Sequence, residues 1–412
     1  MSDRLTTPQY SDDLVLSNGV ALVGEALDAR PFQRMLVRDG RVATFDGEGG
    51  DSSAPTLDLQ GQFVLPGLID CHVHFDLAAA PAAYDHWTKG PLVRSLTCLH
   101  NGLLALSRGI TAVRDLGCAD HLVLEYAAQV DSGVLLGPRV VAAGRPITVT
   151  GGHFCRYARV ADGATEVRKA VREQVGAGAK VIKLMATGGI STPGDPHASQ
   201  LTVDEMTAAV EEAHQRGVPV AAHAHSPAGV RNALAAGVDT IEHAAFIDDA
   251  ALEALSRSRA TLVPTVSALN NIGGGLGIPE ATVEKSLSAR GTYRQSTQRA
   301  IRAGVRIAAG TDAGTALNPI GGLVDELAMY CDAGMTPVEA LQSATSRAGA
   351  VLGDGLGVLD LGSPADMVIV KRDPRRDLDA LREPAYVVSR GRLVPMPWVQ
   401  EALRQLSEAT KP

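Results

Sequence analysis

The sequence predicts an α/β protein, a (β/α)8 TIM barrel with a small β-sandwich domain built from both termini. Three observations support this fold. The middle of the chain alternates short apolar runs with amphipathic stretches, both ends are rich in short alternating strands, and side chains of metal-binding type follow several of the apolar runs. Parallel α/β barrels carry their chemistry at the C-terminal ends of their strands, so the third observation agrees with the first.

The composition fits this size of fold. The chain has 412 residues and is 45% apolar, which is enough for a barrel core and a small accessory domain. A net charge of −8 gives no reason to expect nucleic acid or an anionic membrane as partner, so a small-molecule substrate is expected. Residues 1–13 lack the features of a secretory signal, no apolar run is long enough to span a membrane, and five scattered cysteines predict reduced thiols. Together these features predict a cytoplasmic protein.

Both ends of the chain are predicted to be all-β, because short alternating runs lie between tight turns. The runs are 14–19, 34–43, 365–370 and 385–394. Asn18-Gly19 and Asp39-Gly40 are typical of hairpin turns. We therefore predict a composite β-sandwich domain from residues 1–64 and 356–412, and a (β/α)8 barrel from residues 65–355.

The middle of the chain contains eight apolar runs, the number of strands that a closed barrel requires. They are 67–71, 112–115, 139–143, 180–184, 219–222, 240–242, 261–264 and 306–309. Amphipathic stretches at 164–176 and 203–216 predict helices between strands, and Thr202 with Glu205 has the spacing of a capping box. Three glycines at 273–275 predict a loop over the strand ends.

His72 and His74 follow the first barrel run with one residue between them. Residues at i and i+2 of a strand point to one face, so both imidazoles can bind the same divalent ion. The alternative for so short a motif is a pair of core or surface histidines. The hydrophobic strand before them and the neighbouring Asp70 favour a metal site.

Lys183 lies inside the apolar run 181–185, which should be buried on both faces. An unpaired ammonium would be costly there, which leaves three interpretations. The lysine is the partner of a carboxylate, a neutral base or Schiff-base nucleophile, or a lysine carboxylated by carbon dioxide. A carbamate would present two oxygens that can bridge two metal ions, and the surrounding histidines favour this interpretation.

His223 and His243 end two successive predicted strands, with a short helix predicted at 227–236 between them. Either histidine alone could be a hydrogen-bonded core residue, but as a pair on neighbouring strand ends they predict a second metal site. Asp312 follows the last predicted strand, where a carboxylate can bind the first metal and accept a proton from an activated water. A capping role at the next turn is the alternative for Asp312.

These motifs resemble the amidohydrolase superfamily over nearly the whole chain. Four segments are similar to its subgroup of Xaa-Pro and other dipeptidases and carboxypeptidases, which includes ochratoxin-type amidases. They are Thr150-Gly151-Gly152-His153, Lys183-Leu184-Met185-Ala186-Thr187-Gly188-Gly189, His223-Ala224-His225 and Ile241-Glu242-His243-Ala244. The resemblance implies a binuclear centre, usually of zinc, and a homo-oligomer, because relatives often are oligomers. The implied metal residues are His72 and His74 on one ion, His223 and His243 on the other, carboxylated Lys183 as bridge, and Asp312 as ligand and proton shuttle.

The resemblance also extends to substrate contacts. Peptidase relatives have a tyrosine near the end of the fifth strand, whereas this chain has His225 two residues past His223, as in the ochratoxinase-like members. His225 is therefore a candidate for catalysis and for substrate binding, and His153 is expected to reach the substrate from its loop. Tyr157 on the same loop is a candidate contact for a carboxylate, with a solvated loop position as the alternative.

The predicted function is hydrolysis of an amide or peptide C–N bond next to a carboxylate-bearing amino-acid residue, by a metal-activated water. Dipeptides, N-acyl amino acids and ochratoxin-like amides are the expected substrates. A hydrolase of cyclic amides or ureas, of imidazolone or phenylurea type, is the alternative within the same class. A mononuclear deaminase would have no use for Lys183. A barrel that serves only as a scaffold would not need the metal-type residues.

Overall fold

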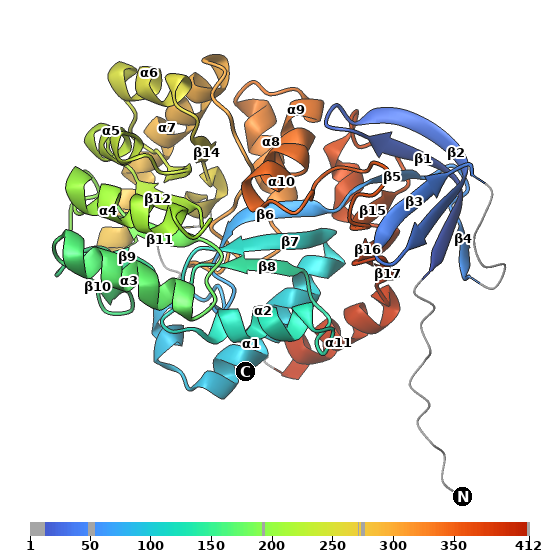
Figure 1. Ribbon diagram of the computed structural model, residues 1–412, viewed down its shortest axis with the longest axis horizontal. Coiled ribbons are helices and arrows are strands. Elements are labelled where there is room, and N and C mark those ends of the chain that lie inside the picture. The colour runs from blue at the N-terminus through green and yellow to red at the C-terminus, as the bar shows by residue number, and fades with distance from the viewer. Residues whose placement is uncertain (1–12, 48–53, 192–193, 271, 273–276, 410–412) are drawn as a thin grey trace, which may run out of the picture.

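The computed structural model describes residues 13–47, 54–191, 194–270, 272 and 277–409, and it has a mixed α/β fold. Figure 1 shows a β-rich part formed by both chain ends beside a larger part in which strands and helices alternate. The three glycines of the predicted loop, 273–275, lie outside the described residues. Within the described ranges, no helix combines the length and the apolar character needed to cross a membrane.

Strands from both chain ends form one eight-stranded sheet, with the order β17-β16-β15-β5-β1-β2-β3 and β4 paired to β1. The strands are β1 (Leu14–Val23), β2 (Asp28–Arg38), β3 (Arg41–Phe45), β4 (Thr56–Asp58), β5 (Phe63–Pro66), β15 (Met367–Val370), β16 (Tyr386–Ser389) and β17 (Arg392–Leu393). β15 pairs antiparallel with β5, and Leu16, Met35 and Ile369 share one buried cluster. The two ends of the chain therefore share a sheet and a hydrophobic core.

One turn predicted from the sequence is wrong. Asn18 and Gly19 lie inside β1, whereas Asp39 and Gly40 form the predicted turn between β2 and β3, with φ of 50° and 70°. A Cβ at Gly19 would lie 2.7 Å from the ring of Phe32 on β2. Glycine is required here because a neighbouring ring approaches the backbone closely, and not because the chain reverses.

The parallel strands form two sheets, with the orders β6-β7-β8 and β10-β9-β11-β12-β13-β14. Their bounds are β6 (Leu68–Val73), β7 (Ile110–Asp115), β8 (Arg139–Ala142), β9 (Ile147–Thr148), β10 (Arg159–Val160), β11 (Ile182–Met185), β12 (Val220–Ala224), β13 (Thr240–His243) and β14 (Thr261–Val263). Seven of the eight predicted barrel strands correspond to β6, β7, β8, β11, β12, β13 and β14.

The eighth predicted strand, 306–309, is not a regular strand in the structure. Ile307 makes an isolated parallel bridge with Leu262 of β14, and the N–H of Cys71 on β6 donates 2.9 Å to the carbonyl of Ala309. Lys180 likewise donates from before β11 to a carbonyl of β8, at 3.0 Å. A few hydrogen bonds thus cross the gaps between the two sheets. The described strands do not form one closed sheet, so the predicted closed barrel is not confirmed.

Helices alternate with the parallel strands and pack beside them, α1 and α2 near β6 to β8 and α3 to α6 near β9 to β14 (Figure 1). The helices are η1 (Ala83–Thr88), α1 (Pro91–Ser107), α2 (Leu122–Asp131), α3 (Ala164–Gly176), α4 (Val203–His214), α5 (Pro227–Ala236), α6 (Asp249–Arg257), η2 (Val266–Leu269), α7 (Glu280–Arg302), α8 (Leu323–Asp332), α9 (Pro337–Ser343), α10 (Ser346–Leu352), η3 (Leu378–Arg382) and α11 (Met396–Ala409). The capping box predicted at Thr202 and Glu205 is present at the start of α4.

Candidate metal centre

The residues predicted to bind metal lie at the C-terminal ends of the parallel strands. β6, β11, β12 and β13 each carry one of them, and the others follow β6 and the segment 306–309. All six line one cavity of about 240 Å³ together with His153 and His225. These six are His72, His74, Lys183, His223, His243 and Asp312. Residues that are up to 240 positions apart in the sequence, His72 and Asp312, therefore meet in one place.

His72, His74 and Asp312 form the first group that could hold a metal ion, with ligand atoms within 4.8 Å of one another. Nδ1 of His72 faces a carboxylate oxygen of Glu242 at 2.9 Å, and Nδ1 of His74 faces the carbonyl of Gly117 at 2.8 Å. Both partners can only accept, so each Nδ1 carries the proton and each Nε2 is left with a lone pair.

Both of these lone pairs face a carboxylate oxygen of Asp312. Nε2 of His72 and of His74 lie 3.4 and 3.2 Å from Oδ1 of Asp312. Three acceptors at such distances repel one another unless a cation or a proton lies between them. Burial opposes a charge on His74, yet the hydrogen bond and the charge of Asp312 raise the pKa of this histidine. The donor set therefore fits a divalent cation.

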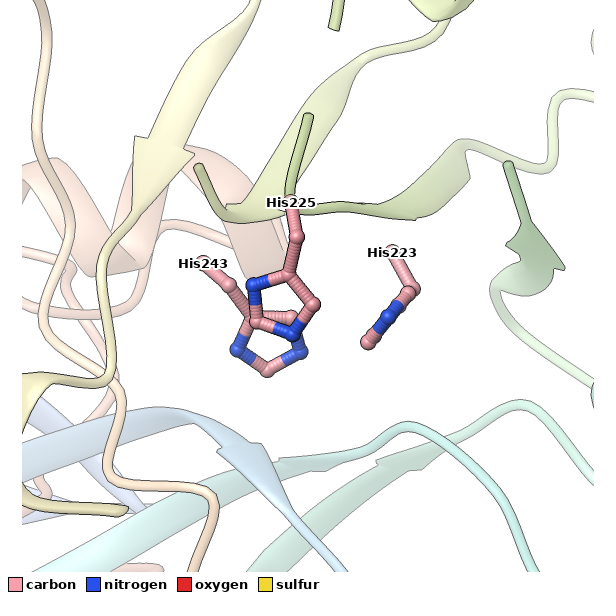
Figure 2. A group of neighbouring side chains, drawn as sticks. All are labelled: His223, His225 and His243. Carbon is pink, nitrogen blue, oxygen red and sulfur yellow. The ribbon is translucent and has the colours of Figure 1, made fainter. Parts of the chain in front are cut away.

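His223, His225 and His243 form the second group, again with ligand atoms within 4.8 Å. Figure 2 shows the three side chains near one another, with the rings of His225 and His243 overlapping in this view and His223 beside them. The rings of His225 and His243 are stacked, with centroids 4.9 Å apart. Nε2 of His223 lies 3.0 Å from the carbonyl of Gly188, so its proton is on Nε2 and its Nδ1 is free to bind a metal.

His225 differs from the other histidines of the cavity. Its Nδ1 is buried and has no hydrogen-bond partner among the described residues. Metal-binding histidines almost always donate their second ring nitrogen to an acceptor. The geometry thus brings His225 to the second group, but the structure does not orient it as it orients His72, His74 and His223.

Lys183 is 2% exposed and faces the same cavity. Burial lowers its pKa to about 8, with Glu242 and Asp312 opposing the shift. Within the described residues, no carboxylate lies within 4.0 Å of its ammonium group. A direct ion pair, one of the three interpretations of this lysine, is thus absent from the described structure.

Two of the predicted ligands have an unusual backbone conformation. His243 has φ of 76° and Asp312 has φ of 58°, in the left-handed region that residues other than glycine seldom adopt. Such conformations cost about 1–3 kcal/mol each and persist where the surrounding structure holds them. The strand ends therefore carry strain at two residues that face the cavity.

Gly189 leaves room for the side chain of His153. A Cβ at Gly189 would lie 2.0 Å from the imidazole of His153. His153 is 3% exposed, lines the cavity, and has its ring 4.5 Å from that of His223. The glycine motif after β11 thus brings the loop of His153 against the second histidine group.

Tyr157 is not among the residues that line the cavity. Its ring is half-buried and packs edge-on against Trp87, with centroids 4.9 Å apart. Trp87 in turn lies against His74 and Phe154. Tyr157 therefore packs behind the first group through Trp87 of η1 and does not face the cavity.

Glu242 is a buried residue of the site for which no role was predicted, although it lies in the motif Ile241-Glu242-His243-Ala244. This buried carboxylate accepts from His72 with one oxygen and from Arg114 with the other, both at 2.9 Å. Burial would raise its pKa, but Arg114 and His72 hold it down to about 2. Arg114 and Glu242 thus form a buried ion pair between β7 and β13. The sequence signal for Glu242 is the same as that for Lys183, a charged residue inside an apolar run that forms a buried strand.

The walls of the cavity beyond the histidines are mainly apolar. They include Phe154, Met185, Ile190, Leu269 and Ile278. The charged groups on the described lining are Lys183, Asp85 and Asp312, and no arginine is among them. A substrate anion in this cavity would therefore meet histidines and not a guanidinium.

The comparisons with known proteins agree with this chemistry. The sequence pattern of the Amidohydrolase family matches residues 63–394. Ochratoxinase of Aspergillus niger is 31% identical over 363 residues, which cover 79% of this chain and 73% of that protein.

Two solved structures are similar over almost their full length. A Xaa-Pro dipeptidase with methionine bound in its active site has a TM-score of 0.86 and 28% identity, covering 93% of this chain and 99% of that one. A prolidase in complex with N-methylphosphonate-L-proline has a TM-score of 0.85 and 32% identity, with the same coverage.

Proposed function

The chain belongs to the amidohydrolase family and is a hydrolase of C–N bonds, and from this premise we propose that it is a binuclear metallohydrolase of amide or peptide bonds. One observation carries the proposal. Two groups of ligand-type side chains converge on one cavity, and in the first the lone pairs of two imidazoles face a carboxylate oxygen. Such an arrangement is unfavourable unless a cation or a proton lies between these atoms, and a divalent cation also fits the second group of histidines.

The residues that would hold the two ions follow from this geometry. His72, His74 and Asp312 would hold the first, and His223 and His243 the second. Lys183 would hold both as a carbamate, formed when its neutral amine adds to carbon dioxide and releases a proton. Two divalent cations, zinc in this proposal, would polarise the scissile carbonyl and lower the pKa of the attacking water.

Asp312 has the proton-transfer role in this proposal. Its Oδ1 faces the cavity between His72 and His74. Burial would raise the pKa of Asp312, but its interactions with His72, His74 and Lys183 outweigh burial and lower it. A carboxylate that is ionised at neutral pH can accept a proton from water and then deliver it to the departing amine. The proton thus moves from the nucleophile to the leaving group through one side chain.

We propose a substrate that carries a carboxylate next to the scissile bond. Ochratoxinase and the prolidases among the relatives support an amide of an amino acid. His153 and His225 line the cavity beside the metal-type residues, where an imidazole can donate to a carboxylate. The apolar walls suit an acyl or side-chain group without charge.

The proposal includes a closed (β/α)8 barrel. The hydrogen bonds of segment 306–309 to β14 on one side and to β6 on the other support the proposal that this segment is the eighth strand of the barrel. This closure would bring Asp312 beside His72 and His74 from the far end of the chain.

The test is a substrate library. Zinc-loaded enzyme should release free amino acids from N-acyl amino acids and dipeptides, with higher kcat/KM for apolar acyl groups. Cyclic amides and phenylureas belong in the same library. Turnover of these alone would overturn the amino-acid amide assignment and leave C–N hydrolysis intact. A chain that binds no metal ion would refute the binuclear centre.

A further inference from the structure

His243 is held by two polar residues that no sequence motif connects to it, and one of them, Tyr293, also lines the cavity. Its Nδ1 lies 2.7 Å from Oγ1 of Thr265, and Thr265 lies 2.9 Å from the hydroxyl of Tyr293 on α7. The Tyr293 hydroxyl in turn donates to the carbonyl of Pro264. All three polar side chains are buried, at 6%, 0% and 2% exposure for His243, Thr265 and Tyr293.

The directions of these hydrogen bonds follow from the inventory of protons. A carbonyl oxygen can only accept, so the single hydroxyl proton of Tyr293 goes to Pro264. The contact between Thr265 and Tyr293 then needs the proton of Thr265. The Thr265 oxygen is left as an acceptor toward His243, and Nδ1 of His243 must be the donor. The proton of the imidazole is thus on Nδ1, and Nε2 is free.

The reverse arrangement is unfavourable. If Thr265 donated to His243, Tyr293 would have to donate to Thr265, and its oxygen would face the carbonyl of Pro264 with no proton between them. Two buried acceptors in contact would repel each other. All donors in this chain of hydrogen bonds, which we call the relay, therefore point the same way. His243 donates to Thr265, Thr265 to Tyr293, and Tyr293 to the carbonyl of Pro264.

The backbone of Thr265 is held in place for this contact. Its φ is 53°, a strained value for a β-branched residue. The next two N–H groups, of Val266 and Ser267, both donate to the buried carboxylate of Glu326 on α8, each at 2.7 Å. Glu326 thus anchors the turn that presents the Thr265 hydroxyl to His243.

We infer that Thr265 and Tyr293 are positioning residues that fix His243 in the tautomer whose Nε2 can bind a divalent cation. The inference rests on the proposed metal site at His223 and His243. It goes beyond that site because it assigns a role to two side chains that are not themselves ligands. One of them, Tyr293, lies on α7, 50 residues after His243 in the sequence. Loss of the relay would let the imidazole proton move to Nε2, where it blocks binding.

The experiment uses three variants of the full chain. Tyr293→Phe removes the acceptor for the Thr265 proton, and Thr265→Val removes the acceptor for His243 while keeping the side-chain shape. Thr265→Ser keeps the hydroxyl and should therefore keep the orientation of His243. Tyr126→Phe is the matched control, because the Tyr126 hydroxyl is buried on α2 and has no partner among the described residues.

The first readout is the number of zinc ions per chain at equilibrium over a series of free Zn²⁺ concentrations set by a chelator. Tyr293→Phe and Thr265→Val should bind one of the two ions about 10- to 100-fold more weakly, the range found when outer partners of metal-binding histidines are removed. Thr265→Ser and Tyr126→Phe should bind both ions as the wild type does. Wild-type affinity in both Tyr293→Phe and Thr265→Val would overturn the relay.

The second readout needs no metal. ¹⁵N NMR of histidine-labelled protein distinguishes protonated from unprotonated ring nitrogens, and His243→Gln identifies the His243 signals. Wild type should carry its His243 proton on Nδ1, and Tyr293→Phe should move it partly to Nε2. Should the wild type bind no zinc, the proposed function fails while this tautomer measurement still decides the relay. An Nε2 proton on His243 in the wild type would refute it.

Discussion

Nδ1 of His72 lies 2.9 Å from one oxygen of Glu242, and the second oxygen of the same carboxylate accepts a 2.9 Å hydrogen bond from Arg114. Three parallel strands, β6, β7 and β13, are joined by this one carboxylate. Because the three side chains are buried, the contact fixes the ring of His72 with Nε2 toward Asp312. The carboxylate of Glu242 thus both forms the ion pair between strands and orients the proposed ligand His72.

We expect Glu242→Gln to weaken the binding of Zn²⁺ by about 10- to 100-fold, because the neutral amide holds and polarises His72 less well. Tm should also fall, since Arg114 would lose its buried charge partner. Metal content and Tm check the two effects separately. Glu211→Gln, which breaks an exposed pair with Arg168, should change neither. Unchanged zinc affinity in Glu242→Gln would contradict a role for this carboxylate in metal binding.

Lys183→Ala should lose metal and turnover together, because the proposed bridge between the two ions disappears. Small carboxylic acids such as acetate should restore part of the rate by supplying oxygens in the vacated space. Lys180→Ala is the control, since Lys180 is exposed just before the same strand. Two bound metals and full turnover in Lys183→Ala would end the carbamate proposal.

Asp312→Asn should lower kcat by about 10²–10⁴-fold, the contribution of a positioned acid or base. The amide keeps the shape of the side chain but cannot take the proton of water. KM should change less, because no substrate contact is removed. Asp249→Asn, at a fully exposed position, should behave as the wild type. Near-normal turnover with both metals bound would move the proton-transfer role to another residue, with His225 as the next candidate.

Most of the strand pattern could be predicted because buried parallel strands appear as short continuous apolar runs. The exceptions have physical causes. The segment 306–309 has an apolar run but makes only isolated pairings in the described structure, and Gly19 serves a close contact with Phe32 that no local pattern reveals. Sequence patterns report which residues are apolar. They do not report which partner backbone comes within hydrogen-bonding reach.

Some residues of the candidate site could likewise be predicted from the sequence, and others could not. The metal-type residues could be found because histidine, lysine and aspartate at the ends of apolar runs are chemically conspicuous. Thr265 and Tyr293 could not, since a threonine after a strand and a tyrosine in a helix are ordinary in sequence. Their role comes from the direction of hydrogen bonds between segments that only the fold brings together. The candidate ligands can thus be proposed from local sequence, whereas the orientation of their rings depends on tertiary contacts.

The last prediction concerns the side of the cavity that would receive a substrate carboxylate. Nδ1 of His225 is buried without a partner among the described residues, while His153 lines the same cavity. With no arginine on the described lining, an anionic group would have to be recognised by these imidazoles. A hydrogen bond to a charged group contributes about 1.5–3 kcal/mol, and a factor of ten corresponds to about 1.4 kcal/mol.

His153→Ala and His225→Ala should therefore each lower kcat/KM about 10- to 100-fold on a carboxylate substrate, and much less on the same substrate with the carboxylate amidated. His225→Asn, whose amide nitrogen can lie near the position of Nδ1, should keep part of the rate. Both zinc ions should stay bound in all three variants. If His225→Ala instead loses one zinc ion, and its kcat/KM falls equally on both substrates, His225 is a third ligand of the second metal. The carboxylate would then have to be recognised by His153 alone.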